Sequence, residues 1–393
     1  MTVANKNIIT PSIFILVLMI SLGPFGDTIY APSLPNIALA FNTAYQNVQL
    51  TITFYLLGYS IGQLLYGPFS DRFGRKPILI LGASSFFIGS AICLLSPNIT
   101  ILITGRFVQG FGACAGAVIS SAAVRDAFAP QEQGRVFAKM NTAFAIAPGL
   151  GAIIGTFISW QMNFSILFIL SIILLIAVIV LFPETIRKYN NSAIKPKPFV
   201  LNYFSLFRTT GYLSYLLILG LNIGMVYSCL VEAPAIVITT LKLDQTWFIV
   251  IAIGIVMAFM IGSIICTKLC RKIKADHILF IGMLISLVGS IMFIAFVIFN
   301  IINLISFLIP IIIIFTGISF VIPIATAQSL APFNITAGSA SAMMGFFQMG
   351  MASLITIIVT SSPLTGLMTL PVSFITLSIL AILVLYVHIL RHS

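Results

Sequence analysis

The feature that most constrains this chain is a recurrence of apolar blocks, each about as long as the 20 residues that a helix needs to cross a bilayer. Only 7% of the 393 residues are charged and 60% are hydrophobic. Soluble proteins carry about 25% charged residues, so this chain lacks the polar surface that a soluble fold needs. The blocks are twice as long as the strands of a membrane β-barrel, and we therefore expect an all-α membrane protein.

We expect twelve transmembrane helices, at 11–31, 48–67, 77–95, 100–124, 136–158, 163–182, 212–238, 246–267, 277–299, 302–327, 339–361 and 367–390. Most connections between them are short, which makes consecutive helices antiparallel neighbours. The exception is 184–210, with five basic residues and the polar run Asn190–Ser192. We interpret it as a cytoplasmic linker, with a helix along the membrane surface, between six-helix halves at 1–183 and 211–393.

The basic residues predict the orientation of these spans. The net charge is +11, and all 19 Lys and Arg residues except Lys242 and Arg106 fall in the tails or on alternate connections. Lys and Arg accumulate on the cytoplasmic side of membrane proteins, so both termini are expected to be cytoplasmic. The positive charge therefore indicates orientation in a lipid bilayer and not a nucleic-acid partner.

One charged connection occurs twice. Gly67–Lys76, GPFSDRFGRK, holds Asp71, Arg72, Arg75 and Lys76 between two predicted spans. A shift of 196 residues places it on Ser263–Lys272, SIICTKLCRK, which keeps the three basic positions and lacks the acid. Two six-helix halves repeated in parallel are typical of one large class of transporters, which bind substrate between the halves near mid-membrane.

Three segments resemble a known family. Gly67–Lys76 fits the loop pattern G-x-x-x-D-R-x-G-R-[RK] of the major facilitator superfamily. Gly26–Pro35, GDTIYAPSLP, and Arg106–Gly112, RFVQGFG, look like the bicyclomycin-resistance (Bcr/CflA) branch of drug:proton antiporters. The resemblance covers nearly the whole chain for the superfamily and mainly the first five spans for the branch. It implies two pseudo-symmetric halves and drug export by proton antiport across a bacterial inner membrane.

Two ionisable residues lie inside predicted spans at similar depth. Asp27 and Arg106 are each about five residues from the outer ends of their helices. A charged side chain at the centre of a membrane helix costs about 2.5–3.5 kcal/mol, so charges within spans need a reason. Burial favours a neutral carboxyl, whereas a nearby guanidinium favours a charged one. We hypothesise that Asp27 carries the proton and Arg106 modulates it, as the resemblance also implies. The alternatives are a static ion pair, or an Asp27 that meets external water. Met19 stands where some relatives have a second acid.

The substrate site is less well defined by the sequence. Glu232 lies near the outer end of the seventh span, the repeat partner of the first, and either binds a cationic substrate or second proton or is a solvated acid at the helix mouth. We expect polar and aromatic residues of the spans to line a cavity for a small molecule; the candidates are Tyr30, Tyr55, Gln109, Tyr227, Glu232 and Phe347.

The loop Gly67–Lys76 is predicted to be a conformational latch rather than a binding site. Gly67 and Gly74 would allow close approach and a tight turn. The resemblance implies that Asp71 faces the N-terminal end of the eleventh span and that Arg75 approaches Asp126, which closes the cytoplasmic side. Arg72 and Lys76 belong to the same loop. Positive-inside topology alone explains its basic residues but not its aspartate.

The fifth span contains Pro148, Gly151 and Gly155, a spacing that permits close helix packing and a bend. It resembles the antiporter motif of exporters, although Ala152 stands where a second proline is common. This similarity favours export.

Other chemistries find no support in the sequence. The five cysteines form no external pair, and Cys266 and Cys270, four apart, have no further metal ligands nearby. The chain lacks a nucleotide-binding loop and a hydrolase triad, so we expect no enzyme, no metal and no cofactor, with the proton gradient as the energy source. We expect a monomer. The alternatives are a proton-coupled transporter of one metabolite, such as an amino acid or siderophore, and a non-transporting receptor.

Overall fold

The computed structural model describes residues 9–186, 189–191, 193–194, 203–333, 337–363 and 366–392, and within these ranges it consists of helices and short connections. The first half contains α1 (Ile13–Thr28), a 3-10 turn η1 (Ala31–Ser33), α2 (Leu34–Ala40), α3 (Tyr45–Phe73), α4 (Arg75–Leu94), α5 (Ile99–Ala127), α6 (Pro130–Phe157) and α7 (Trp160–Leu181). The second contains α9 (Tyr212–Ala235), a π-helical turn η2 (Ile236–Thr240), α10 (Trp247–Leu269), α11 (Ala275–Ile298), α12 (Leu304–Leu330), α13 (Ala337–Thr360), a 3-10 turn η3 (Gly366–Met368) and α14 (Thr369–His392).

Twelve of the described helical segments are long and apolar enough to cross a membrane, which confirms the predicted number of spans. The first span continues through η1 and α2 to Ala40, beyond the predicted end at residue 31. Pro32 and Pro35 cause this difference, since each lies in the first turn of a new helical segment, where proline needs no amide partner. The predicted surface helix of the linker falls largely on 187–188, 192 and 195–202, outside the described residues, although 203–206 are helical.

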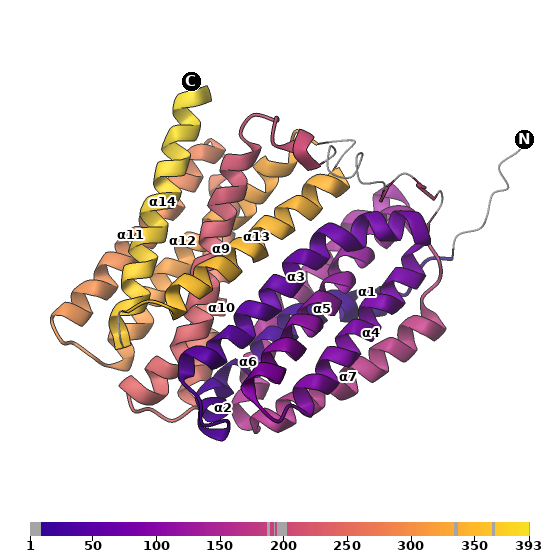
Figure 1. Ribbon diagram of the computed structural model, residues 1–393. Coiled ribbons are helices and arrows are strands. Elements are labelled where there is room, and N and C mark those ends of the chain that lie inside the picture. The colour runs from indigo at the N-terminus through magenta and orange to yellow at the C-terminus, as the bar shows by residue number, and fades with distance from the viewer. Residues whose placement is uncertain are drawn as a thin grey trace, which may run out of the picture.

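Each half has its own hydrophobic core. One core is built almost entirely from α1–α7 and the other from α9–α14. The two helix groups lie beside each other, and α3 meets α13 along the boundary (Figure 1). The second main contact across this boundary is between α6 and α10. The second and fifth spans of each half therefore pack against the fifth and second spans of the other, as two parallel repeats require.

The repeated charged connection is visible in the helix ends. α3 ends at Phe73 and α10 at Leu269, which are corresponding residues under the shift of 196. Peripheral helices present apolar side chains outward; on α7, Ile169, Ile173, Ile176 and Val180 are exposed at helical spacing. Such a stripe is compatible with lipid and not with water.

Candidate functional site

Asp27 lies in the last turns of α1, where it contacts the other half of the protein. Its side chain is only 3% exposed. The hydroxyl of Tyr227, on α9, donates a hydrogen bond of 2.7 Å to Oδ2 of Asp27, and Oδ1 has no hydrogen-bond partner. The carboxyl group is therefore separated from external water and is stabilised by one hydrogen bond, which crosses from the second half to the first.

Arg106, on α5, is completely buried and held by residues of the first half. Its guanidinium carbon lies 4.3 Å from the ring centre of Tyr30 and 4.1 Å from that of Tyr55, an arrangement that cation–π attraction stabilises. Nη1 donates to the carbonyl oxygen of Gly26, at 3.1 Å, and to Oε1 of Gln109. Nε and Nη2 have no partner. We call Tyr30, Tyr55, Gln109 and the Gly26 carbonyl the Arg106 cage.

Asp27 and Arg106 are near neighbours but do not form the static ion pair that the sequence left open. Both ion pairs found in the described part of the chain involve Arg75, at the start of α4. The guanidinium donates to the backbone of Gly26, next to Asp27, while an oxygen of Asp27 and two nitrogens of Arg106 remain unpartnered. Buried polar groups without partners are costly, so Asp27 and Arg106 are the least satisfied polar side chains of this group.

Close helix contact builds the Arg106 cage. A Cβ atom at Gly110 would collide with the backbone carbonyl of Tyr55, so only glycine lets α5 approach α3 closely enough to place the Tyr55 ring over Arg106. The Tyr55 hydroxyl then donates to the carbonyl of Gly23, at 2.9 Å, and the Tyr30 hydroxyl is 3.0 Å from Oγ1 of Thr51. These bonds fix both rings.

The structure brings four of the six predicted substrate residues together. Tyr30, Tyr55, Gln109 and Tyr227 do gather around Asp27 and Arg106, but their polar atoms are used in bonds within the protein. Gln109 is fully buried, and its amide nitrogen also donates to Oγ of Ser90 on α4, at 2.8 Å. In this structure these residues contact Asp27 or Arg106, and one face each of Tyr30 and Tyr55 meets the guanidinium. Their binding of a substrate stays a prediction.

The other two candidates lie apart from this group. Glu232 is half-buried and accepts a hydrogen bond of 2.9 Å from the side chain of Gln49 on α3, so it belongs to the contact between the halves and is not a freely solvated acid. Phe347, on α13, packs against Phe207 with ring centres 5.7 Å apart, in an aromatic cluster near the end of the linker. The structure does not bring Phe347 to Asp27.

Between α3 and α4, Arg75 lies between two carboxylates. Its Nη1 is 2.6 Å from Asp71, and its Nε is 2.8 Å from Asp126 at the end of α5. The approach of Arg75 to Asp126 is as the resemblance implied. The ion-pair partner of Asp71 among the described residues is Arg75, one turn away, and its approach to the N-terminal end of α13 stays a prediction.

The glycines of this loop also differ from expectation. Gly67 lies inside α3, which continues to Phe73, and a Cβ atom there would meet only Val118 at 4.0 Å. It therefore makes neither a turn nor a close approach. The turn is confined to Gly74, whose φ of 106° and ψ of 153° are essentially restricted to glycine.

Glu184 is a loop residue whose role the sequence did not reveal. Its carboxylate accepts hydrogen bonds from the backbone amides of Arg75, at 2.9 Å, and Lys76, at 3.1 Å, at the start of α4. A helix that begins with two basic residues lacks the negative charge that its N-terminus favours, and Glu184 supplies it from the end of α7. In the sequence, the signal for Glu184 was the helix start at Arg75 and Lys76, because two basic residues there need an acidic partner from another part of the chain.

A tyrosine joins this end of the first half to the linker. The Tyr203 hydroxyl donates to the carbonyl of Leu64 on α3, at 3.1 Å. Burial, with a smaller contribution from the charge of Asp71, raises the pKa of Tyr203 to about 12. The residue is therefore neutral and a hydrogen-bond donor over the physiological pH range.

The predicted exporter motif lies on α6, against α1. Cβ atoms at Gly151 and Gly155 would collide with Thr28 and with the carbonyl of Ile29, so both glycines permit the close packing of these helices. Pro148 lies inside the same helix. This contact positions the end of α1 that carries Asp27.

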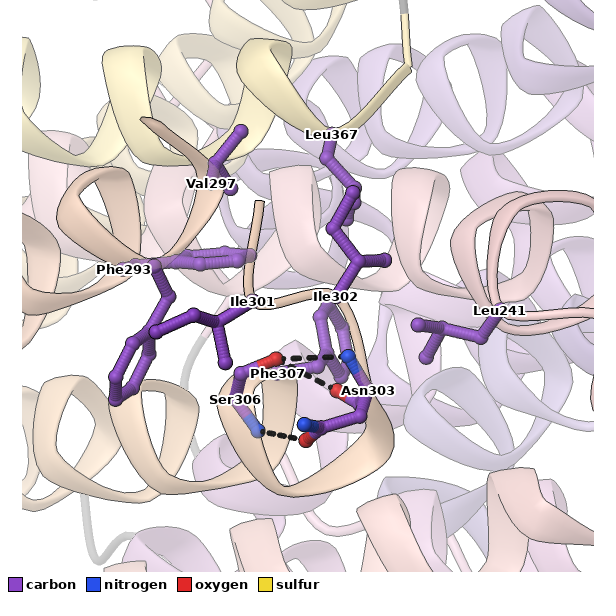
Figure 2. Close-up of a pocket in the computed structure, with 10 residues that line it drawn as sticks. Leu241, Phe293, Val297, Ile301, Ile302, Asn303, Ser306, Phe307 and Leu367 are labelled. Atoms are coloured by element: carbon purple, nitrogen blue, oxygen red, sulfur yellow. Dashed lines mark hydrogen bonds between the residues drawn. The ribbon is translucent and has the colours of Figure 1, made fainter. Parts of the chain in front are cut away.

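A pocket in the second half is unrelated to this site. The cavity, of about 10 Å³, lies between α11, α12 and η3, and its lining is mainly apolar (Figure 2). Its polar residues, Asn303 and Ser306, satisfy each other in the cap at the start of α12. No titratable side chain lines it. The described residues also contain no group of three His, Cys, Asp or Glu side chains suited to a metal ion.

Comparisons with known proteins agree with this architecture. Residues 16–360 match the profile of the Major Facilitator Superfamily. The chain is 30% identical to a bicyclomycin resistance protein homolog of Haemophilus influenzae, with 70% of each chain covered. It is 23% identical to multidrug resistance protein D of Escherichia coli, over 86% of this chain and 85% of that protein. A solved D-xylose-proton symporter has the same fold, with a TM-score of 0.75 and 16% identity, over 94% of this chain and 96% of that one.

Proposed function

Because the chain belongs to the Major Facilitator Superfamily, we propose that it is a secondary transporter that exports small amphipathic molecules, drugs among them, in exchange for protons. The observation that carries this proposal is the buried carboxyl of Asp27, which has no ion pair and one hydrogen bond from the opposite half. Relatives named for multidrug and bicyclomycin resistance support export of drugs.

In this mechanism Asp27 exchanges the proton and Arg106 sets the balance between its charged and neutral forms. A buried carboxylate without a countercharge is strongly disfavoured, whereas a neutral carboxyl with one hydrogen bond is tolerated. The Arg106 cage keeps a positive charge beside Asp27 without neutralising it. Opening the outer side hydrates Asp27, and closing it again favours the protonated form, so proton binding and the movement of the halves are linked.

The membrane arrangement follows from the charges. We propose a multi-pass protein of the bacterial inner membrane with both termini in the cytoplasm, a linker over 184–210, and action as a monomer. The Arg75 cluster then lies at the cytoplasmic surface, and Asp27 in the outer part of the membrane. No cofactor is needed, because the proton gradient supplies the energy.

We propose that Asp71, Arg75 and Asp126 form a latch that steers the conformational cycle without touching substrate. Asp71→Asn removes the ion pair to the half-exposed Asp71 carboxylate and leaves Asp126 in place. The lost ion pair is worth about 1 kcal/mol in the conformation that contains it. A loss of this size is expected to slow turnover about fivefold while leaving substrate affinity unchanged. Transport rate and substrate binding, measured separately on purified protein, check this. Glu132→Gln, an exposed acid at the start of α6, is the control. A large loss of affinity in Asp71→Asn would contradict the latch.

The direction of transport is tested with purified protein in vesicles under an imposed pH gradient. A panel of amphipathic compounds is expected to contain at least one that moves opposite to the protons, and reversing the gradient should reverse its movement. Movement in the same direction as protons would instead show import. If no compound in the panel moves and none induces proton movement, the transporter assignment fails in favour of a receptor.

A further inference from the structure

Several hydrogen bonds tie the two halves together near the outer side. Oη of Tyr45 donates to the carbonyl of Val231 at 2.9 Å, and Gln49 donates to Glu232 at 2.9 Å. Oη of Tyr227 donates to Asp27 at 2.7 Å. The Tyr45 bond ends on a neutral backbone carbonyl, whereas the Tyr227 bond ends on the carboxyl that we propose to exchange protons. The strength of the Tyr227 tie therefore depends on whether Asp27 binds a proton.

We propose that Tyr227 is a positioning residue that limits how far deprotonation of Asp27 opens the outer side. This inference rests on the proposed function, because it needs Asp27 to exchange the proton. A hydroxyl bound to a charged carboxylate is held more strongly than one bound to a neutral carboxyl. While the outer side is closed, Tyr227 thus partly compensates the charge of a deprotonated Asp27, which has no other hydrogen-bond partner.

The packing of α9 places Tyr227 in this role. Ile223, Tyr227 and Leu230 form one stripe that packs against the core of the first half. Tyr227 is therefore carried by the second half but docks on the first. When the halves separate on the outer side, its hydroxyl must leave Asp27. The tie exists only in the closed arrangement.

The groups that face Asp27 are few, which makes a pH response interpretable. α5 contributes Arg106, α3 contributes Tyr55 and Tyr59, α9 contributes Tyr227, and Tyr30 follows α1 in the chain. From α6 the glycines Gly151 and Gly155 face α1, and from α7 Leu167 approaches Gly26; these are not titratable. Among these groups Asp27 is the one that exchanges a proton between pH 5 and 9 in our proposal.

The test measures opening of the outer side as a function of pH. Spin labels at Leu39→Cys, at the end of α2, and Phe299→Cys, after α11, are on exposed positions of opposite halves. Cys270 is the exposed cysteine and is replaced by alanine. Pulsed electron–electron distance measurements between pH 5 and 9 give the ratio of open to closed protein in the parent, Tyr227→Phe and Tyr45→Phe. Each tyrosine variant loses one hydroxyl that joins the halves.

Both variants are expected to be more open than the parent. The increase in Tyr45→Phe should be the same at every pH. In Tyr227→Phe it should be about tenfold larger at alkaline than at acidic pH, because the bond lost is charge-assisted only when Asp27 is ionised. With Asp27→Asn in the background, the effect of Tyr227→Phe should become independent of pH. An increase in Tyr227→Phe that is the same at every pH, as in Tyr45→Phe, overturns the inference.

The Asp27→Asn background also separates this inference from the proposed function. If Asp27→Asn leaves the pH dependence of opening intact, Asp27 is not the proton site and the proposed function fails at that residue. If Asp27→Asn removes the pH dependence while Tyr227→Phe acts equally at all pH values, the proton site stands and the role of Tyr227 alone is refuted.

Discussion

Asp27→Asn is expected to abolish proton-coupled transport and leave a folded protein. Asparagine has nearly the same shape as aspartate, and its amide oxygen accepts the hydrogen bond from Tyr227, so the contact between α1 and α9 is kept. It cannot bind or release a proton. The amide resembles the neutral carboxyl, which we associate with the closed outer side, so folding should be unaffected while the cycle loses its link to the proton gradient.

The measurement is substrate-induced proton release from purified protein, together with gradient-driven transport in vesicles. Both should fall to the level of a sample without protein. Glu232→Gln is the matched control, because it replaces another acid of the spans that accepts a hydrogen bond across the halves, from Gln49. It is expected to retain proton coupling. An Asp27→Asn variant that transports at the parent rate with the parent pH dependence would refute the assignment.

Arg106→Lys is expected to destabilise the protein and stop transport, although the charge is conserved. A lysine ammonium cannot stack flat between Tyr30 and Tyr55. It also lacks the planar guanidinium group that donates hydrogen bonds to Gly26 and Gln109. Each buried cation–π contact is worth up to about 2 kcal/mol, and a hydrogen bond to a charged group about 1.5–3 kcal/mol. Some of this is recovered by the ammonium, so we expect a net loss on the order of 3 kcal/mol, as when a buried charge loses its partners.

The unfolding temperature in detergent and transport in vesicles measure this effect. Arg125→Lys, on the same helix but exposed in its last turn, is the control and should change the free energy of unfolding by no more than about 0.5 kcal/mol. A variant Arg106→Lys as stable and active as the parent would show that the two tyrosine rings contribute little to holding Arg106.

The difference between prediction and structure at this site has a physical origin. The sequence placed Asp27 and Arg106 at similar depth, because depth follows from residue count along a helix. The residue count does not determine which side of each helix faces the other. Lipid is as apolar as a protein interior, so the hydrophobic pattern of a span does not mark the face that packs inward. Tyr227, 200 residues from Asp27, therefore appeared only as one aromatic residue among many.

The same reason explains why the sequence did not show the contacts of the other candidate residues. Tyr30, Tyr55 and Gln109 were candidates for substrate binding because they are polar or aromatic within spans. In the structure they form the cage around Arg106, and Phe347 lies in another cluster. Gly67 was expected to allow the close approach and tight turn of the charged loop, yet α3 continues through it to Phe73. Neither the partner of a side chain nor the end of a helix is fixed by residue type alone.

The sequence by itself determined the number of spans, the division of the charges between connections, the internal repeat and the two ionisable residues inside the membrane. These are local properties. The length of a span follows from the thickness of the bilayer, and a charged residue within a span is costly whichever helices surround it. The tertiary structure alone decided that Arg106 is held by two tyrosines rather than by Asp27, and that Asp27 is bound by Tyr227 from the opposite half. These contacts depend on the rotation of each helix about its axis, which only the packing of all the helices together specifies.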